Sequence, residues 1–148
     1  MDIINFKVSH ASLLEIESHL TECSNLFVPA LSSYVDLHRY SFKIVTNTIT
    51  FEAWNENYLV GLIAAYKNIE AKTFFITNIS VVASFHGKTV SKKLLEFFFN
   101  ICRNDLFNSV SLEVYKINNK AVSFYVKQGF RIIGSTDTIF LMVYDFFY

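Results

Sequence analysis

Residues 85–91, with the sequence FHGKTVS, connect an apolar run to the start of a helix-type pattern. The first backbone N–H groups of a helix lack partners within it, and together with the helix dipole they form an anion site. Gly87, Thr89 and Ser91 are small enough to let a phosphate approach the backbone. Three lysines add positive charge: Lys88, Lys92 and Lys93. A pyrophosphate would fit this loop, although an ordinary capped turn often has the same composition.

A second group of residues with chemical potential lies within 112–130, LEVYKINNKAVSFYVKQGF. Asn118 follows a β-type run and precedes a helix-type pattern that carries Tyr125. Asn is a preferred residue at a helix N-terminus, so its type alone predicts a cap as readily as a ligand contact. Tyr125, likewise, could be a core tyrosine or a functional phenol.

Composition and charge narrow the classes of function. The chain has 148 residues, 52% of them hydrophobic, with one Pro and four Gly, and this predicts one folded domain over residues 1–148. Its 13 basic residues balance 13 acidic ones, which argues against a nucleic-acid partner. Cys23 and Cys102 lack the spacing of a metal or redox site, so no metal is expected. No membrane span or signal peptide is evident, and we expect a cytoplasmic protein.

The elements that must position these residues follow from hydrophobic periodicity. Residues 2–8 alternate like a strand, and Ser9 or Ser12 can cap a helix whose apolar face includes Leu13, Leu14, Ile16 and Leu20. A weaker helical stretch follows Pro29 and runs through Leu37. Two β-rich runs come next, joined by a turn at 55–57 as in a hairpin: residues 44–54 and 58–66.

The second half of the chain alternates strands with helices. A β-rich run at 73–83 precedes a helix marked by Val90, Leu94, Phe98 and Ile101. Three further strands are expected at 110–115, 130–133 and 138–146, with a helix from Asn119 to Lys127 that ends before Gly129 at the C′ position. The sum is an α+β domain with a mixed central sheet of six to seven strands flanked by about four helices.

These segments together resemble the acyl-CoA-binding half of the GNAT N-acetyltransferase family. The resemblance lies in Asn118, Ala121, Tyr125, Gly129 and Phe130, and in the upstream sequences Ile79-Ser80-Val81, Phe85-His86-Gly87-Lys88 and Leu94-Leu95. The loop departs from the family, which usually has Arg or Gln where this chain has His86 and Gly or Ala where it has Thr89 and Ser91. His86 could therefore reach a pyrophosphate or be a solvent-exposed loop residue without a role.

The resemblance implies an enzyme that binds acetyl-CoA between two diverging parallel strands, the first of which carries a bulge. A backbone N–H, that of Val81, would polarise the thioester carbonyl. Asn118 would hold the pantetheine amides, and Tyr125 would hydrogen-bond to the departing thiolate. The expected catalytic residues are thus Tyr125 and Val81. The expected acetyl-CoA contacts are Ile79, Ser80, Val81, Val82, His86, Gly87, Lys88, Thr89, Val90, Ser91, Lys92, Asn118, Ala121, Phe124 and Tyr125.

A general base is not evident, because residues 75–80 contain no carboxylate. Glu113 and Glu52 are the nearest acidic candidates, although each is more typical of a solvated strand residue. Water relayed by Asn78 or Ser80 is an equal alternative, and an acceptor with a low amine pKa would ease the requirement.

The acceptor is expected to be a primary amine of a small molecule, with an amino sugar as a guess within that class and a protein N-terminus or lysine as the alternative. Six residues could form an aromatic acceptor pocket: Phe27, Tyr34, His38, Tyr40, Trp54 and Tyr115. A non-catalytic acyl-CoA-binding module also fits the sequence. The aromatic runs at 97–99 and 139–148 raise the further possibilities of an interaction protein and of a homodimer built on the C-terminal strand.

Overall fold

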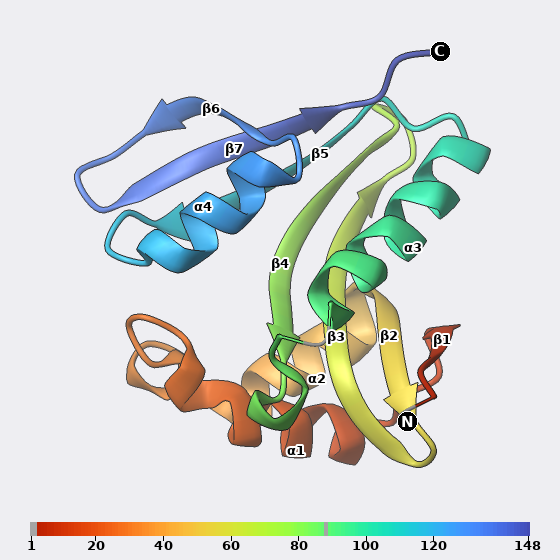
Figure 1. Cartoon of the computed structure of the whole chain (residues 1–148), viewed down its shortest axis with the longest axis vertical. Helices are drawn as coiled ribbons and strands as arrows, with labels where there is room; N and C mark the ends of the chain where they lie inside the picture. The colour runs from red at the N-terminus through yellow and green to blue at the C-terminus, as the bar shows by residue number, and fades with distance from the viewer. Residues whose placement is uncertain (1–2, 88) are drawn as a thin grey trace.

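The computed structural model of the chain describes residues 3–87 and 89–148, so Lys88 lies outside the described residues. Within that part the chain forms one seven-stranded mixed sheet in the order β1-β2-β3-β4-β5-β7-β6 (Figure 1). Only β4 and β5 pair in parallel. The strands are β1 (Asn5–Val8), β2 (Ile49–Asn55), β3 (Tyr58–Asn68), β4 (Thr73–Val81), β5 (Ser109–Tyr115), β6 (Arg131–Ser135) and β7 (Ile139–Asp145). The expected α+β architecture is confirmed.

In the described residues, four α-helices cover the two faces of this sheet: α1 (Leu13–Cys23), α2 (Leu37–Asn47), α3 (Val90–Asn104) and α4 (Asn119–Lys127). Helices α1 and α2 lie against one face, where Ile16, Leu20 and Ile44 pack on Leu62 of β3. Helices α3 and α4 lie on the opposite face, over the larger core. No helix in the described ranges is long and apolar enough to cross a membrane.

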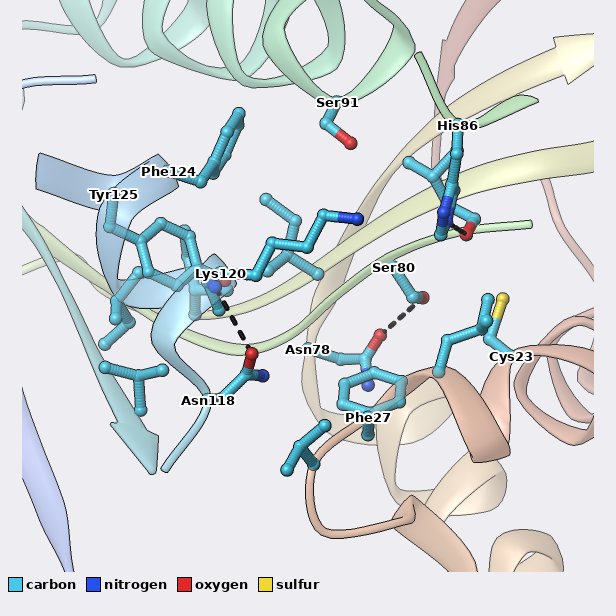
Figure 2. Close-up of a pocket in the computed structure, with 18 of the residues that line it drawn as sticks. Cys23, Phe27, Asn78, Ser80, His86, Ser91, Asn118, Lys120, Phe124 and Tyr125 are labelled. Atoms are coloured by element: carbon cyan, nitrogen blue, oxygen red, sulfur yellow. Dashed lines mark hydrogen bonds between the residues drawn. The ribbon is translucent and has the colours of Figure 1, made fainter. Parts of the chain in front are cut away.

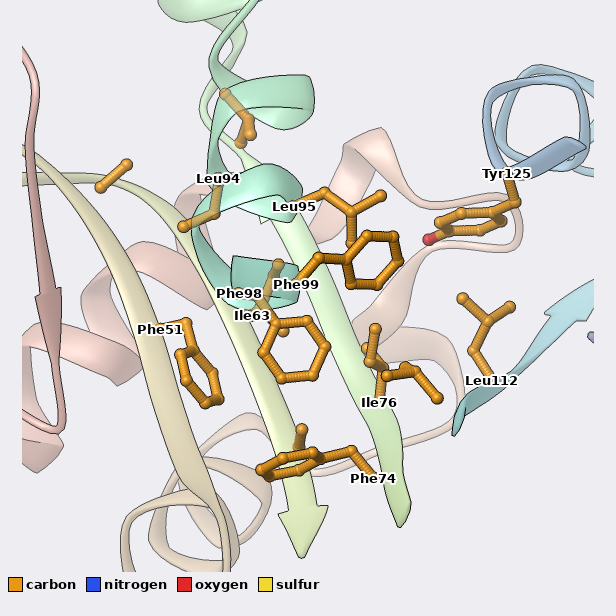
Figure 3. Packing of buried hydrophobic residues seen from close by; sticks show 14 of the residues in the cluster. Phe51, Ile63, Phe74, Ile76, Leu94, Leu95, Phe98, Phe99, Leu112 and Tyr125 are labelled. Atoms are coloured by element: carbon orange, nitrogen blue, oxygen red, sulfur yellow. The ribbon is translucent and has the colours of Figure 1, made fainter. Parts of the chain in front are cut away.

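Aromatic side chains make up the centre of the larger core (Figure 3). The ring centroid of Phe98 on α3 lies 4.5 Å from that of Phe51 and 5.2 Å from that of Phe74. Pairs of this kind contribute about 0.5–1.5 kcal/mol each beyond simple burial. Phe99 is also buried. The aromatic run at 97–99, which raised the interaction-protein alternative, is therefore mainly core packing.

Local capping explains where α1 begins and where α4 ends. The Ser12 hydroxyl accepts a hydrogen bond from the Glu15 N–H at 3.2 Å, and the Glu15 carboxylate accepts one from the Ser12 N–H at 2.9 Å. This capping box selects Ser12 over Ser9. Helix α4 ends in a Schellman arrangement, because Gly129 has φ +104° and its N–H, like that of Phe130, bonds back to the last turn.

The second helix differs from its prediction. The sequence suggested a helix from Pro29 to Leu37 and a strand from residue 44, whereas α2 spans Leu37–Asn47 and β2 begins at Ile49. Asp36 caps α2 by accepting from the Arg39 N–H at 2.9 Å. The β-branched run at 44–48 favoured a strand, but burial of Ile44 against the sheet outweighs that weak preference.

Strand β4 contains a bulge near its middle. Its register with β3 shifts between the pairs Ala64–Asn78 and Ala65–Ile76, which leaves Thr77 as an extra residue. A single inserted residue exchanges the two faces of a strand beyond it. Ile76 accordingly packs in the larger core, whereas Asn78 turns to the opposite face.

The bulge coincides with the separation of β4 from β5. Their parallel ladder ends at the pair Ile76–Leu112, although both strands continue. The two strands therefore diverge, as Figure 1 shows, and leave an opening in the middle of the sheet.

Candidate functional site

The opening between β4 and β5 contains a cavity of about 670 Å³ (Figure 2). Most of the residues expected from the sequence line it: Ile79, Ser80, Val81, His86, Gly87, Thr89, Val90, Ser91, Lys92, Asn118, Ala121, Phe124 and Tyr125. Val82 lies outside the lining, fully buried, with its N–H bonded to the carbonyl of Val60 at 2.9 Å. Lys88 falls outside the described residues.

Backbone groups of β4 point into this cavity. Because Val82 bonds to Val60 across the β3–β4 ladder, the alternation of an antiparallel pair turns the N–H groups of Ile79 and Val81 away from β3. The β5 ladder has already ended at Ile76. These two N–H groups are therefore directed into the opening, where a carbonyl could accept from them.

The loop between β4 and α3 presents the N-terminus of a helix to the cavity. Gly87 has φ +76° and Thr89, the N-cap, has φ +62° without a side-chain cap on the helix. Thr is β-branched, and a positive φ at such a residue is rare. The first N–H groups of α3, at Val90, Ser91 and Lys92, thus have no side-chain cap from Thr89, and such N–H groups can bind an anion.

His86 ties this loop to the end of β4. Its Nε2 lies 2.7 Å from the carbonyl oxygen of Val81, so Nε2 carries a proton and donates it. A ring held in this way shapes the loop, and only Nδ1 remains for another partner.

Helix α4 contributes the opposite wall of the cavity. The Asn118 side-chain oxygen accepts from the Ala121 N–H at 3.2 Å and so caps the helix, which leaves the amide nitrogen for a ligand. Capping and ligand binding are therefore compatible at this residue. Phe124 and Tyr125 follow one turn later and line the cavity (Figure 2).

Tyr125 is only 6% exposed, and its ring packs edge-on against Phe124 and Phe130. Burial raises the pKa of its phenol well above the ordinary value of 10. The hydroxyl is therefore neutral at pH 7 and can donate a hydrogen bond. No atom among the described residues takes that hydrogen bond.

The aromatic residues expected around an acceptor divide into two groups. One group lines the cavity: Phe27, Tyr34 and Tyr115. The rings of Tyr34 and Tyr115 pack edge-on, with their centroids 5.6 Å apart. The other three lie elsewhere: His38 is exposed beside Glu17, Tyr40 bonds to the Thr77 carbonyl, and Trp54 is buried beside Glu52.

The two carboxylates considered as bases differ in environment. Glu113 is exposed and lines the cavity. Glu52 is fully buried away from it and accepts hydrogen bonds from four donor groups: the N–H groups of His10 and Ala11, the Thr50 hydroxyl and the Trp54 indole. Glu52 is thus not a solvated strand residue. It joins β2 to the segment that begins α1.

Several residues at or beside the cavity were not expected as site residues, and Lys120, Cys23 and His19 are the ones among them with titratable side chains. Lys120 and Cys23 line it, and Lys120 extends over its centre in Figure 2. His19 lies behind Ser80, with its Nε2 2.9 Å from the Ser80 hydroxyl. A histidine on the apolar face of α1, three residues after Ile16, was the available sequence signal.

Comparison with known proteins agrees with this geometry. The family described as "Acetyltransferase (GNAT) family" matches residues 13–130, most of the chain. The chain belongs to the GNAT acetyltransferase family. Members of this family are acyltransferases, and we assign the chain to that class of enzyme. No curated protein matches it in a sequence search.

Solved structures similar to this GNAT chain include enzymes with different acceptors. PaiA N-acetyltransferase from Thermoplasma acidophilum, solved with coenzyme A, has a TM-score of 0.74, 14% identity and coverage of 96% of this chain and 99% of its own. The ribosomal-protein-S18-alanine N-acetyltransferase from Escherichia coli has a TM-score of 0.76 and 13% identity, with coverage of 95% of this chain and 94% of its own. A putative streptothricin acetyltransferase from Bacillus anthracis, solved with acetyl coenzyme A, has a TM-score of 0.59 and 24% identity, with coverage of 68% of this chain and 63% of its own. At these identities the likeness shows the GNAT fold.

Proposed function

We propose that this GNAT chain transfers the acetyl group of acetyl-CoA to a primary amine of a small molecule, by direct attack of the amine on the thioester. The observation that carries the proposal is the end of the β4–β5 ladder at Ile76–Leu112, which leaves the N–H groups of Ile79 and Val81 facing a cavity. The helix N-terminus at Thr89 borders the same cavity.

The residues present suit acetyl-CoA. The N–H groups at the start of α3 offer donors for a pyrophosphate, and the Lys92 and Lys120 side chains add positive charge at the cavity. The Asn118 amide nitrogen and the β4 backbone offer hydrogen bonds to the pantetheine amides. Acetyl-CoA would supply the acetyl group as an activated thioester.

Two groups would assist the transfer. The Val81 N–H would stabilise the thioester oxygen as it gains negative charge. The neutral Tyr125 phenol would donate a hydrogen bond to the sulfur as the C–S bond breaks. A thiol with a pKa of about 8.5 is a stronger acid than the phenol, so a hydrogen bond suffices and proton transfer is not required.

Cys23 does not act as an acetyl carrier in this proposal. Its side chain lines the cavity, but burial raises the pKa of the thiol to about 12. The thiolate is the nucleophilic form of cysteine, and at pH 7 this thiol is almost entirely protonated. Direct attack by the amine is therefore favoured over an acetyl-cysteine intermediate.

The acceptor would lie against Phe27, Tyr34 and Tyr115. Aromatic faces suit apolar amines and the faces of sugars, and an amino sugar is one candidate. A protein N-terminus is the second candidate class, because one structural neighbour is named for acetylating an alanine of a ribosomal protein.

Acetyl-CoA binding is tested with a matched pair at Gly87, whose φ of +76° strains any side chain while leaving room for one. Gly87→Asp places a carboxylate beside the expected phosphates, and Gly87→Asn has the same shape without the charge. At a hundredfold excess over the dissociation constant, acetyl-CoA should stabilise the wild type by about 2.7 kcal/mol. The rise in Tm should survive in the Asn variant and disappear in the Asp variant; equal rises in both would contradict phosphate binding at this loop.

Turnover is tested by thiol release from acetyl-CoA with glucosamine, tyramine and an alanyl peptide as acceptors. Release with glucosamine or tyramine supports the proposal, and release with the peptide alone would replace it by N-terminal acetylation. Binding without release would favour the non-catalytic acyl-CoA-binding module.

We further propose a single domain, a cytoplasmic location and a homodimer. Two buried free cysteines suit a reducing compartment. The C-terminal strand on which the dimer was expected is β7, which pairs with β5 on one side and with β6 on the other and so is not an edge of the sheet. The edge strand is β6, which exposes Ile132 and Ile133, each at 47%, and Phe147 beyond β7 is 91% exposed. Apolar groups at an unpaired sheet edge favour association with a second copy.

A further inference from the structure

A chain of buried polar groups runs from α1 to the wall of the cavity. His19 is 2% exposed, and its Nδ1 lies 3.0 Å from the carbonyl oxygen of Leu59. Its Nε2 lies 2.9 Å from the Ser80 hydroxyl, which lies 2.9 Å from the side-chain oxygen of Asn78. Figure 2 shows Ser80 and Asn78 facing each other beside Cys23.

The position of the proton on His19 follows from its partners. A carbonyl oxygen only accepts hydrogen bonds, so the Leu59 contact requires a proton on Nδ1. A neutral imidazole then has a bare lone pair on Nε2, directed at Ser80. Burial lowers the pKa of His19 below 6.5, which keeps the ring neutral at pH 7.

The Ser80 hydroxyl has one proton and two neighbouring acceptors. If that proton went to the Asn78 oxygen, the lone pairs of Ser80 Oγ and His19 Nε2 would face each other without a hydrogen between them. In that arrangement Asn78 Nδ2, which is buried, also has no partner among the described residues. Rotating the Asn78 amide by half a turn removes the clash of lone pairs, since Nδ2 then donates to Ser80 and Ser80 donates to His19, and the buried atom without a partner among the described residues becomes Oδ1 instead of Nδ2.

The bulge in β4 makes this arrangement possible. Beyond Thr77, Asn78 and Ser80 face α1, while both side chains still line the cavity. Ser80 is 7% exposed and separates the cavity from His19. A proton accepted by the Ser80 oxygen from the cavity side can therefore pass inward to the imidazole.

We propose that Ser80 and His19 form the proton relay that deprotonates the attacking amine, an inference that rests on the proposed acetyl transfer. As the neutral amine forms the C–N bond, its nitrogen becomes acidic and gives a proton to Ser80 Oγ. The Ser80 hydroxyl proton passes to His19 Nε2, and the C–S bond breaks to release the thiolate. The imidazolium then returns its proton to solvent through Ser80, so the enzyme is regenerated.

The charged and titratable groups around His19 are consistent with this role. Glu22 on the same helix favours an imidazolium, while its carboxylate also accepts from the Tyr58 hydroxyl on β3. Cys23 Sγ lies 3.7 Å from Nε2 and is a weaker partner than Ser80. Since the Cys23 thiol has a pKa of about 12, it does not supply a competing charge.

The relay is tested by the pH dependence of kcat in four variants, with acetyl-CoA and the best of the three acceptors named above. Ser80→Ala and His19→Gln should each lower kcat by about 10²- to 10⁴-fold, the usual contribution of general acid–base catalysis. Ser80→Thr keeps a hydroxyl and should retain most of the activity. His38→Gln, an exposed histidine outside the cavity, is the control and should match the wild type.

The shape of the pH profile separates the relay from a structural role. The part of the profile that belongs to His19 should lie below pH 6.5, where wild-type kcat should fall as His19 becomes protonated, and His19→Gln should lose this acid limb. Each variant should keep the acetyl-CoA-induced rise in Tm. Wild-type kcat in Ser80→Ala, or an unchanged acid limb in His19→Gln, would overturn the relay while leaving acetyl transfer intact.

A measurement without turnover gives a second decision. Side-chain ¹⁵N NMR of the wild type at pH 8 should show His19 protonated at Nδ1 and bare at Nε2, and a proton on Nε2 would overturn the relay. If the wild type neither binds acetyl-CoA nor releases thiol, the proposed function fails. The protonation state of His19 seen by NMR is a separate result, so the two failures can be told apart. If acetyl-CoA binds but no probe amine is acetylated, the NMR result alone decides.

Discussion

His86 Nε2 donates a hydrogen bond to the carbonyl oxygen of Val81 at 2.7 Å, and this contact closes the loop that leads from β4 to α3. The carbonyl belongs to the same residue whose N–H faces the cavity. The loop histidine therefore fixes the end of β4 beside the helix N-terminus, and its proposed effect on acetyl-CoA is through the shape of the loop.

We expect His86→Ala to weaken acetyl-CoA binding by about 2- to 10-fold, the effect of one neutral hydrogen bond of about 0.5–1.5 kcal/mol. Isothermal titration calorimetry measures the change. A loss of about 100-fold would instead indicate a charge-assisted contact between His86 and the pyrophosphate.

Tyr125→Phe removes the phenol hydroxyl and keeps the ring packed between Phe124 and Phe130. Turnover should fall by about 10- to 10⁴-fold, while acetyl-CoA affinity stays close to that of the wild type. Steady-state kinetics and calorimetry give the two values. The control is Tyr144→Phe, which removes a hydroxyl bonded to Arg103 outside the cavity. Equal turnover in both variants and the wild type would exclude a role for the Tyr125 hydroxyl.

Glu52→Gln should destabilise the fold by about 2–4 kcal/mol, because an amide NH₂ replaces a carboxylate oxygen that faces only donors. Urea unfolding measures the change. Glu70→Gln, at an exposed turn, should alter stability by less than about 0.5 kcal/mol. A similar small effect at Glu52 would show that its buried hydrogen bonds contribute little.

The homodimer predicts a light-scattering mass near twice the 17.1 kDa of one chain at micromolar concentration. Phe147→Asp should produce the monomer, because this ring is 91% exposed and is available to a partner. Phe146 is unsuitable for the same test, since it is 7% exposed and packs against Phe99 within the core. A wild-type mass of one chain would refute the dimer.

The order of the elements and the main motif could be predicted from the sequence because they depend on local rules. The Asn118 cap, the helix with Tyr125 and the turn at Gly129 are each specified by residues within one or two turns of one another. Apolar periodicity likewise located α1, α3 and most strands. The same locality explains the error at α2, where a β-branched run concealed a helix that burial of Ile44 stabilises.

Only the tertiary structure brought His19 to Ser80, 61 residues away in the chain, and Glu52 to the start of α1. These contacts depend on the pairing register of β3 with β4 and on the extra residue Thr77, which decides the face of every following side chain. Strand register is set by long-range packing, and a sequence pattern of period two is the same in either register. The sequence by itself therefore determined local structure, such as helix α4 and its cap. The bulge in β4, which only the tertiary structure shows, decided the position of the buried polar chain beside the cavity.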